Sequence, residues 1–515
     1  MARVVRLTPK AADERRHSAR PLAAVFGGAS PAEAGIVLAF AAALALTALL
    51  VTPTAHGDSG EYFLMIESLF NHLTPDARPD DLNSLAEMGR RHLIRGGYGH
   101  VMAPYLMTGD GRWYAIHFWA YPLACLPAKL LLRLTCLNEI KAPQVTNALL
   151  LAALALVVAR CGLRPPARPL FLFLLALSPA LGFILWPHPE VFSFVFVAMA
   201  LTFMHDDRRG LAVLCAAVAS LQNPPLALFA AYLWLRWTVR ARPRWDHGPT
   251  LTLSARWPEA AVLTAAAAVA VLPALFYLVH FGTPSPLARD AAGTQFLSPR
   301  KAADLFFDLN IGMLPYAPLA LAGALGFGAL AIARSRARAA PLALAAVVAL
   351  MALACTATTN WNHGTTGPSR YAVWLMPFVL YAFAVVAESA AVPRRAWATA
   401  AVLAVATQAA IVVRRGAIFS PEDYGQHSYA ARFVLDRWPA LYSPTPDIFV
   451  NRTPRAGGEH GPFLYTRDGV CRKAFARPKH AAALRAACGE IPERARAFFQ
   501  AEDDEDDKRW AYVDY

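Results

Sequence analysis

Long apolar blocks dominate the pattern of hydrophobic and polar positions along this chain. Each block holds roughly 20 residues, about the length at which a helix spans a hydrocarbon core of about 30 Å. The first block covers residues 34–55, and the others cover 114–136, 142–160, 168–186, 191–205, 210–236, 259–281, 311–333, 340–357, 371–390 and 396–413. The pattern predicts an all-α polytopic membrane protein with about 11 transmembrane helices.

Arginine placement gives these helices a direction, because basic residues favour the cytoplasmic side. Residues 1–33 form a basic cytoplasmic tail, so the transmembrane domain covers 34–414 and its first outer loop covers 56–112. The Arg-rich segments 238–258, 334–340 and 391–395 are also predicted to be cytoplasmic. The segments 282–309, 358–370 and 415–515 are then predicted to lie outside.

Two features disturb simple counting of blocks. Arg160, Arg164 and Arg168 look cytoplasmic, whereas counting puts them outside, so one block between 114 and 186 is re-entrant or kinked. The segment Asn223-Pro224-Pro225 breaks the helical hydrogen-bond ladder and divides the block 210–236 into two short helices.

Composition agrees with a membrane protein. The chain of 515 residues is 56% hydrophobic and 17% charged, against about 45–50% and about 25% in ordinary soluble chains. Its net charge of +13 comes from arginines beside apolar blocks, with no basic face interleaved with aromatics, so nucleic-acid binding is not expected. Ala- and Arg-rich usage with little Lys suggests a bacterial source.

Residues 415–515 are predicted to form a small outer domain with an acidic end at 502–507. Cys471 and Cys488 alone among the cysteines share this soluble segment, and they could form a disulfide in an oxidising compartment.

Candidate chemistry begins directly after the first apolar block, at His56-Gly-Asp58-Ser-Gly-Glu61-Tyr62. Asp58 and Glu61 are three residues apart and therefore share one face of a helix that starts near Ser59. Helix capping by the same two carboxylates is the alternative. The following residues, 61–70, have helical apolar spacing and predict a helix along the membrane surface.

With this acidic motif and the helix after it, the sequence resembles the GT-C glycosyltransferases, in particular bacterial relatives of protein O-mannosyltransferases and aminoarabinose transferases. The resemblance implies a GT-C-like bundle with a long first outer loop, in which Asp58 is the catalytic base and Glu61 lies beside it. Ser59-Gly60 departs from relatives, which often carry a second acidic residue after the Asp.

Two further stretches resemble the family, and the side of the membrane on which the second of them lies depends on which block between 114 and 186 is re-entrant or kinked. The run Gly96-Gly-Tyr98-Gly-His100 resembles the stretch before helix two, and an aromatic belt at the membrane interface is the alternative. The run Trp186-Pro-His188-Pro-Glu190 resembles a second acidic site, and a plain helix-helix turn with Glu190 near a helix start is the alternative.

Basic groups predicted to meet a lipid-linked phosphate come later in the chain. In the run 360–371 Arg370 is the first candidate, followed by His363, because related proteins place an arginine before this helix to meet the phosphate. Arg300 and Lys301, in an outer loop, are further candidates, and contact with lipid headgroups is the alternative. The residues expected to line the site are Tyr62, Tyr98, His100, Asn360, Asn362 and Tyr371.

The resemblance implies an integral membrane glycosyltransferase of a bacterial inner membrane whose site faces the periplasm or exterior. It would move a sugar from a polyprenyl-phosphate donor to a lipid, glycan or protein acceptor, with inversion. No cofactor is required by the pattern; Asp58, Glu61 and Glu190 could bind Mg²⁺ or Mn²⁺ through oxygen. A transporter or lipid flippase, or a non-catalytic GT-C-like subunit, is the alternative.

Overall fold

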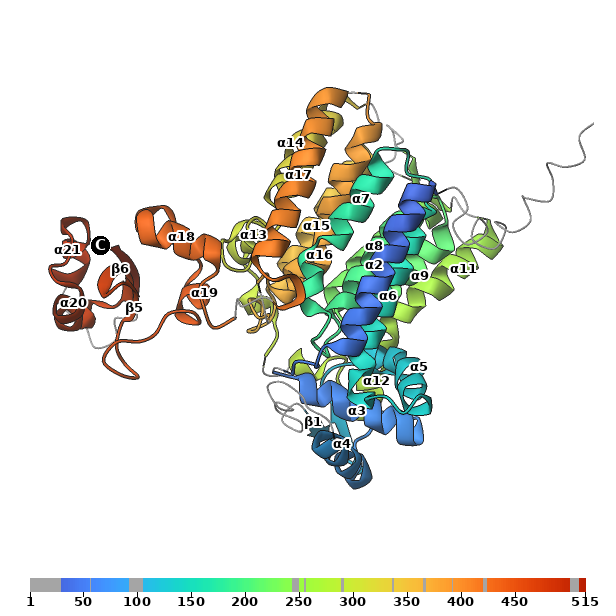
Figure 1. The fold of residues 1–515 in the computed structure, drawn as a ribbon, viewed down its shortest axis with the longest axis horizontal. Helices are drawn as coiled ribbons and strands as arrows, with labels where there is room; N and C mark the ends of the chain where they lie inside the picture. Colours follow the sequence, from blue (N-terminus) through green and yellow to red (C-terminus); the bar gives the residue numbers. More distant parts are fainter. Residues whose placement is uncertain are drawn as a thin grey trace, which may run out of the picture.

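The chain folds mainly into helices, and Figure 1 shows a helical body with a smaller unit beside it. The structure is a computed structural model that describes residues 29–500 and 509–515, except for 56, 92–104, 243–249, 254–255, 289–290, 336–337, 365–366, 391 and 420–423.

The body is built from apolar helices that follow the predicted blocks. They are α2 (Pro31–Leu50), α6 (Ala142–Ala159), α7 (Ala167–Ala176), α8 (Glu190–His205), α9 (Arg209–Ser220), α10 (Ala227–Thr238), α11 (Trp257–Ala268), α12 (Leu272–Phe281), α14 (Pro318–Arg334), α15 (Ala339–Cys355), α16 (Arg370–Val385) and α17 (Arg394–Arg414). Short 3-10 turns extend several of them: η2 (Glu139–Lys141), η3 (Pro179–Phe183), η5 (Val269–Val271) and η8 (Val386–Glu388).

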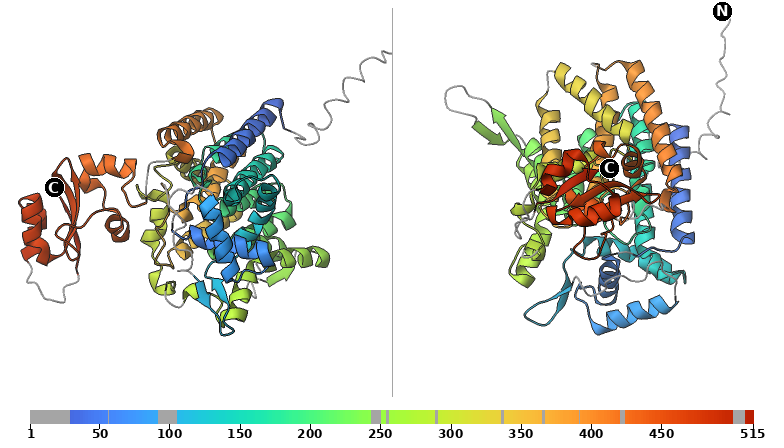
Figure 2. Two further views of the ribbon diagram at one scale, coloured as in Figure 1. Left: turned by 60° about the horizontal axis from the view of Figure 1, so that its bottom comes forward. Right: turned by 90° about the vertical axis from the view of Figure 1, so that its left-hand side faces the viewer.

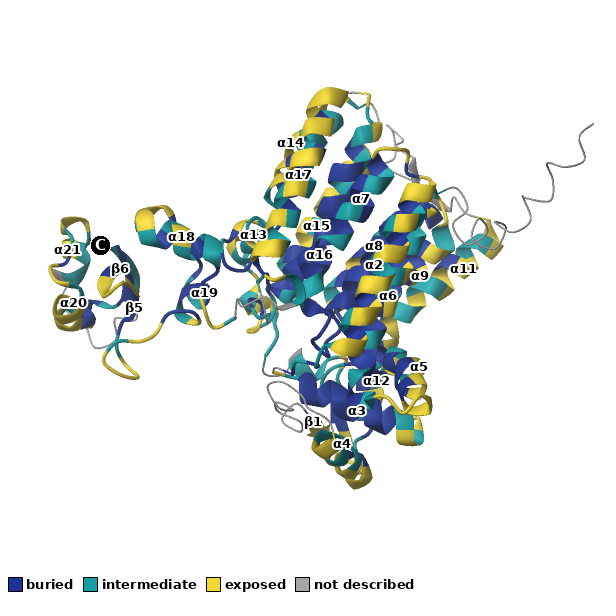
Figure 3. Ribbon diagram, in the orientation of Figure 1, coloured by how far each residue is buried: buried dark blue, intermediate teal, exposed yellow. Residues whose placement is uncertain are grey.

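Five of these helical stretches are long and apolar enough to cross a membrane: Pro31–Leu50, Glu139–Ala159, Trp257–Phe281, Arg370–Glu388 and Arg394–Arg414. Five shorter apolar stretches accompany them. The outer helices α2, α14 and α17 carry exposed apolar side chains, whereas α8 and α16 are buried along most of their length (Figure 3). Apolar exposure on this scale suits a lipid surround rather than water.

The ladder break predicted at Asn223-Pro224-Pro225 is confirmed. The chain stops α9 at Ser220, turns through η4 (Pro224–Leu226) and begins α10 at Ala227. The Asn223 side-chain amide donates to Ser193 Oγ at 2.6 Å, which fixes the turn beside the start of α8.

The block predicted over 114–136 does not form a long apolar helix. Its first residues belong to strand β2 (Trp113–Ala115), which pairs with the preceding strand β1 (Tyr105–Met107), and α5 (Ala120–Leu134) has only 15 residues. Buried Lys129 on α5 bonds Glu67 and lies 3.2 Å from Glu139. A charged network at its centre explains why α5 packs against α3 (Ser59–His72) instead of joining the membrane candidates.

The helix predicted to lie along the membrane surface is also more enclosed than expected. Every residue of α3 from Ser59 to Leu69 is buried, and α4 (Pro79–Arg91) and α5 pack against it. Asp81 of α4 accepts hydrogen bonds from Ser68 and Asn71 of α3, which holds the two helices together. In Figure 1 this group lies below the body.

Side-chain contacts define two ends of the body. At one end, Arg168 bonds Glu33 at 2.8 Å, the Arg164 amide bonds Glu388 at 2.9 Å, and the Gly162 amide bonds Asp206 at 2.7 Å. These contacts gather the first residues of α2 and α7 with the last residues of α6, α8 and η8. The arginines 160, 164 and 168 therefore share an end of the body with Glu388.

At the other end, the chain that follows α2 meets the segment between η3 and α8. The Thr54 amide donates to the Leu185 carbonyl at 3.2 Å, and the Asn147 amide group bonds the carbonyls of Ile184 and Trp186. The segment 184–189 therefore lies beside the start of α3.

The C-terminal residues form a separate unit, at the left in Figure 1 and facing the viewer on the right of Figure 2. A three-stranded antiparallel sheet has the order β5 (Phe463–Arg467), β6 (Val470–Ala476), β7 (Ala511–Asp514). Four helices flank it: α18 (Tyr429–Arg437), α19 (Pro446–Val450), α20 (Ala481–Cys488) and α21 (Glu493–Gln500). A disulfide joins Cys471 on β6 to Cys488 on α20.

The remaining short elements connect these parts. They are the hairpin β3 (Val239–Arg242) and β4 (Thr250–Leu253), the helix α13 (Pro299–Phe307), and the turns η6 (Pro286–Ala288), η7 (Thr294–Phe296), η9 (Ala417–Phe419), η10 (Pro439–Leu441) and η11 (Pro478–His480). The residues 502–507 of the predicted acidic end lie outside the described part.

The two ends of the body give a topology prediction. Arg164 and Thr359 are both exposed, and the stretch Arg370–Glu388 between their neighbourhoods spans about 28 Å at 1.5 Å per residue. In a Cys136→Ser background, which removes the exposed free cysteine among those described, Arg164→Cys and Thr359→Cys should react with an impermeant maleimide from opposite sides of a membrane. Labelling of both from one side would contradict the arrangement.

Candidate functional site

Asp58 stands at the start of α3 with its carboxylate free of helix capping. Its backbone carbonyl accepts from the Glu61 amide at 3.1 Å, but its half-buried side chain makes no capping hydrogen bond. Gly57, at φ +53°, makes the left-handed turn that leads into this position. The capping alternative therefore does not account for the Asp58 carboxylate.

Glu61 is fully buried one turn later and binds the loop before α5. Its Oε1 accepts from the His117 amide at 3.1 Å, and its Oε2 lies 2.7 Å from His117 Nδ1. Burial opposes protonation of His117, but the Glu61 carboxylate, with Asp58 behind it, outweighs this and raises the pKa of His117. The pair joins two segments that are 56 residues apart in the chain.

His188 and Glu190 form a second buried pair at the start of α8. His188 Nδ1 lies 3.0 Å from Glu190 Oε1, and the Trp186 indole stacks on the imidazole at 3.9 Å between centroids. The Tyr62 ring meets His188 edge-on at 4.9 Å. This second acidic site therefore packs directly on α3.

Arg370 begins α16 and is held by its own loop. Ser369 caps the helix by accepting from the Tyr371 amide, and the Arg370 amide donates to the His363 carbonyl at 3.0 Å. The guanidinium donates from Nη2 to the Tyr371 hydroxyl at 3.3 Å.

Tyr62 connects these four places electrostatically. Its phenol is fully buried, and its pKa is raised well above the ordinary value by burial and by the carboxylates of Glu61, Asp58 and Glu190, partly opposed by Arg370. The rings of His117 and His188 lie 6.3 Å apart, with Tyr62 in contact with both. Coulombic shifts arise between charged groups that are near one another and poorly screened by water. The structure thus brings Asp58, Glu61, His117, His188, Glu190 and Arg370 together, and we refer to these six residues as the polar cluster.

Several buried polar atoms at and around the polar cluster have no protein hydrogen-bond partner in the described part of the chain. They are Tyr62 Oη, His188 Nε2, Glu190 Oε2, Asn362 Nδ2, Arg370 Nε and Trp374 Nε1. Buried polar atoms in folded proteins are nearly always paired, so a group of this kind marks a place that binds water or ligand. These six atoms together provide both hydrogen-bond donors and hydrogen-bond acceptors.

His363 lies near Arg370, and its imidazole is neutral. Burial lowers its pKa to about 4, with further lowering by Arg370 and Arg452. Its ring lies 4.7 Å from that of Tyr424, whose hydroxyl also bonds Asn362 at 3.3 Å. At neutral pH His363 can therefore donate one hydrogen bond but carries no charge.

Arg300 and Lys301 are engaged elsewhere, between α13 and the C-terminal unit. Arg300 donates to the Ser443 carbonyl at 3.1 Å, and Lys301 Nζ lies 2.7 Å from Asp447 Oδ2. The Trp361 indole donates to the same Asp447 oxygen at 3.0 Å. Their role toward a phosphate stays a prediction; the contacts they make tie the C-terminal unit to the loop that carries Arg370.

The other residues predicted to line the site differ in where the structure places them. Asn362 is buried beside Tyr424, and Tyr371 contacts Arg370, whereas Asn360 is exposed. Tyr98 and His100 lie outside the described residues. Arg452 and Tyr424, which approach His363 and Asn362, were missed because they lie in the tail and carry no motif.

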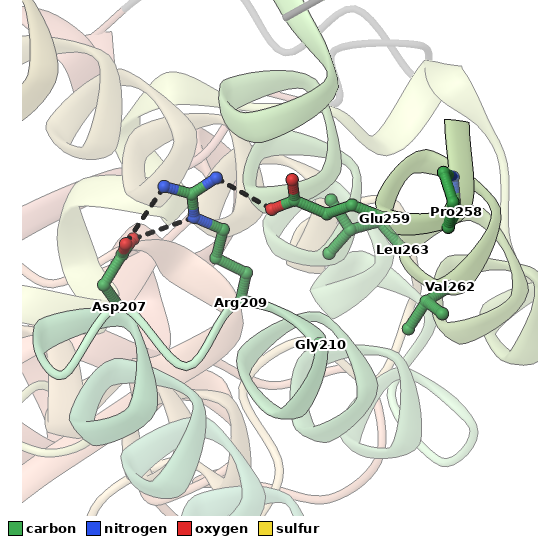
Figure 4. A pocket seen from close by; sticks show the side chains of 7 residues that line it. All are labelled: Asp207, Arg209, Gly210, Pro258, Glu259, Val262 and Leu263. Atoms are coloured by element: carbon green, nitrogen blue, oxygen red, sulfur yellow. Dashed lines mark hydrogen bonds and ion pairs between the residues drawn. The ribbon is translucent and has the colours of Figure 1, made fainter. Parts of the chain in front are cut away.

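A groove of about 590 Å³ lies at the opposite end of the body, between α9 and α11. Figure 4 shows Arg209 between Asp207 and Glu259, bonded to them at 3.0 and 2.8 Å. Because these charges satisfy one another near solvent, the groove does not compete with the polar cluster as a functional site.

Comparison with known proteins adds no assignment: no protein-family model, no curated protein and no solved structure matches this chain.

The junction between α13 and the C-terminal unit gives a pH prediction. Burial raises the pKa of Asp304, which accepts a hydrogen bond from Thr445, to about 6 from an ordinary 3.8, so the folded chain keeps a proton that the unfolded chain loses in that window. Stability should fall as pH rises through it. Asp304→Asn should therefore raise the melting temperature by about 2 °C or more at pH 7.5, with little effect at pH 4.

The matched variant is Asp447→Asn. Although burial acts in the other direction, the Lys301 and Trp361 hydrogen bonds lower the pKa of Asp447. Its contribution to stability is present above about pH 4, so this variant should melt lower at pH 7.5. Equal and pH-independent effects of the two variants would contradict the assignment of these contacts.

Proposed function

We propose that this chain is an integral membrane glycosyltransferase that moves a sugar from a polyprenyl-phosphate donor to an acceptor hydroxyl at the outer face of a bacterial inner membrane. The observation that carries the proposal is the polar cluster, in which carboxylates and a guanidinium converge beside unpartnered buried polar atoms. The apolar body next to it supplies helices between which a polyprenyl chain could lie.

The proposed orientation in the membrane rests on which residues lie at each end of the helical body. Without α5 among the spans, Arg160, Arg164 and Arg168 fall at the same end as the Arg-rich turn after η8, which agrees with a cytoplasmic position. The polar cluster then faces outward. The proposed eleven spans are α2, α6, α7 with η3, α8, α9, α10, α11 with α12, α14, α15, α16 and α17.

In the proposed reaction Asp58 is the general base. Its half-buried carboxylate, free of capping, takes the proton of the acceptor hydroxyl as that oxygen forms a bond to the anomeric carbon. The bond from the anomeric carbon to the phosphate oxygen breaks, and its electron pair leaves with the phosphate. Attack from the face opposite the phosphate inverts the configuration.

Arg370 is assigned to the leaving phosphate. Charge on the phosphate oxygens grows as the glycosidic bond breaks, so a fixed guanidinium stabilises the transition state more than the ground state. Among the residues that the structure describes, the Arg370 Nε has no hydrogen-bond partner, and the Asn362 amide and Trp374 indole offer two more N–H groups without one. Glu190 Oε2 and His188 Nε2 remain for the sugar hydroxyls.

The first test replaces Asp58 by Asn, which keeps the shape and removes the base. Transfer from a radiolabelled polyprenyl-phosphate sugar should fall by a factor of about 10² or more, while membrane insertion and melting temperature stay normal. Asp80→Asn, on the exposed face of α4, is the matched control and should keep full activity. Undiminished transfer by Asp58→Asn would exclude Asp58 as the base.

The second test addresses the donor phosphate. Arg370→Ala should lower kcat/KM for the lipid donor about 10- to 100-fold, the usual worth of hydrogen bonds to a charged group, with most of the loss in kcat because the guanidinium acts on the transition state. Arg370→Lys should recover only part of the activity because lysine cannot bind in two-point fashion. The exposed Arg90→Ala is the control. An unchanged kcat/KM for the donor would contradict the assignment.

The same assay separates the rival classes. A transporter or flippase would move the labelled lipid across vesicles without forming a glycosylated product, and a non-catalytic subunit would do neither.

A further inference from the structure

Asp58, Glu61 and His117 form a compact group of metal-ligand types at the outer edge of the polar cluster. One ligand atom from each lies within 4.8 Å of the other two. Asp58 and Glu61 come from the start of α3, and His117 from the loop between β2 and α5. Two carboxylates and an imidazole on separate segments are a donor set used for divalent transition metals.

The spacing is close to that of one ion's ligands. With bonds of about 2.1 Å, ligand atoms around a single ion lie about 3 Å apart when adjacent and about 4.2 Å apart when opposite. Atoms within 4.8 Å of one another reach this spacing through small side-chain movements.

The contact between Glu61 and His117 already has the spacing of two ligands of one ion. Glu61 Oε2 lies 2.7 Å from His117 Nδ1, and the His117 backbone amide donates to Oε1. Adjacent ligand atoms of one ion lie about 3 Å apart. An ion that takes the place of the proton on Nδ1 would therefore bind Oε2 and Nδ1 together.

The charge and polarity around the group provide a second, independent observation. Among the described residues, the only ion-pair partner of fully buried Glu61 is His117, and no arginine or lysine pairs with Asp58. In the described part of the chain the fully buried Tyr62 hydroxyl beside them has no hydrogen-bond partner, and the Tyr62 ring lies 5.6 Å from that of His117. Even with His117 protonated, two carboxylates and one imidazolium leave a net negative charge in this group, and a bound cation neutralises it.

We propose that Asp58, Glu61 and His117 bind a divalent transition-metal ion, with open positions left for an acceptor hydroxyl. Three protein ligands leave room for substrate, as in catalytic rather than structural sites. The role of the ion rests on the proposed function: bound to the ion, an acceptor hydroxyl has a lowered pKa and passes its proton to Asp58 more easily. The third ligand is His117 rather than Glu190, which pairs with His188.

The test uses the full-length protein, purified in detergent and stripped of metal, with Mn²⁺ as the probe. Electron paramagnetic resonance of free Mn²⁺ should reveal one bound ion per chain, and Zn²⁺ should displace it. His117→Ala and Asp58→Asn should each weaken Mn²⁺ binding at least about 10-fold. His72→Ala, at the other end of α3 and paired with Asp81, is the matched control and should bind normally.

A spectroscopic measurement keeps the proposal testable if His117→Ala fails to fold. Bound Mn²⁺ in the wild-type protein should show nitrogen coupling from one imidazole in its electron spin echo modulation. No bound Mn²⁺ or Zn²⁺, or binding without nitrogen coupling, would overturn the proposal.

The two proposals fail differently. Transfer activity that survives chelation, in a protein that binds no ion, would sink the metal site and leave the glycosyltransferase intact. Ion binding at these residues in a protein that transfers no sugar would do the reverse.

Discussion

A fully buried carboxylate, Glu61, organises the end of the helical body at which the polar cluster lies. Burying a charge is costly unless it is paired and hydrogen-bonded, and Glu61 meets that requirement by taking two contacts from His117. The contacts lock the start of α3 against the loop before α5. Asp58 lies one turn earlier, and Tyr62 lies one residue later with its ring against His188, so this pair fixes the α3 side of the polar cluster.

Contacts from two other parts of the molecule hold the remaining members of the polar cluster in place. The segment from Trp186 to Glu190 is held by Asn147 and stacks on the cluster from the helical body. The loop before α16 is held from the other side, where Asp447 of the C-terminal unit binds both Trp361 and Lys301. The C-terminal unit thus has a structural task at the loop that carries Arg370.

Much of this organisation could be predicted from the sequence because it is local. The apolar blocks and the break at Asn223 can be recognised from neighbouring residues alone, and the motifs around Asp58, Glu190 and Arg370 lie beside helix ends. The prediction of a transmembrane helix over 114–136 was wrong because hydropathy reports only the composition of the block. It cannot show that Lys129 forms an ion pair with Glu67 of another helix. With α5 set apart from the spans, the conflict over Arg160, Arg164 and Arg168 disappears.

Long-range pairing explains the remaining differences. Glu61 and His117 are 56 residues apart, and nothing in the sequence between them indicates that they meet. Arg300 and Lys301 looked like free outer cations, but in the folded chain they contact residues about 140 positions later. Which charges are already paired, and which are left for a ligand, is decided by tertiary structure alone.

The most direct measurement is an experimental structure of the full chain in a lipid nanodisc with a non-transferable polyprenyl-phosphate sugar analogue. The account predicts density for the phosphate at the Arg370 guanidinium and the Asn362 amide, with the anomeric carbon facing Asp58. Density for the phosphate at the Arg209 end of the body, or an Asp58 carboxylate separated from Arg370 by packed protein, would contradict it.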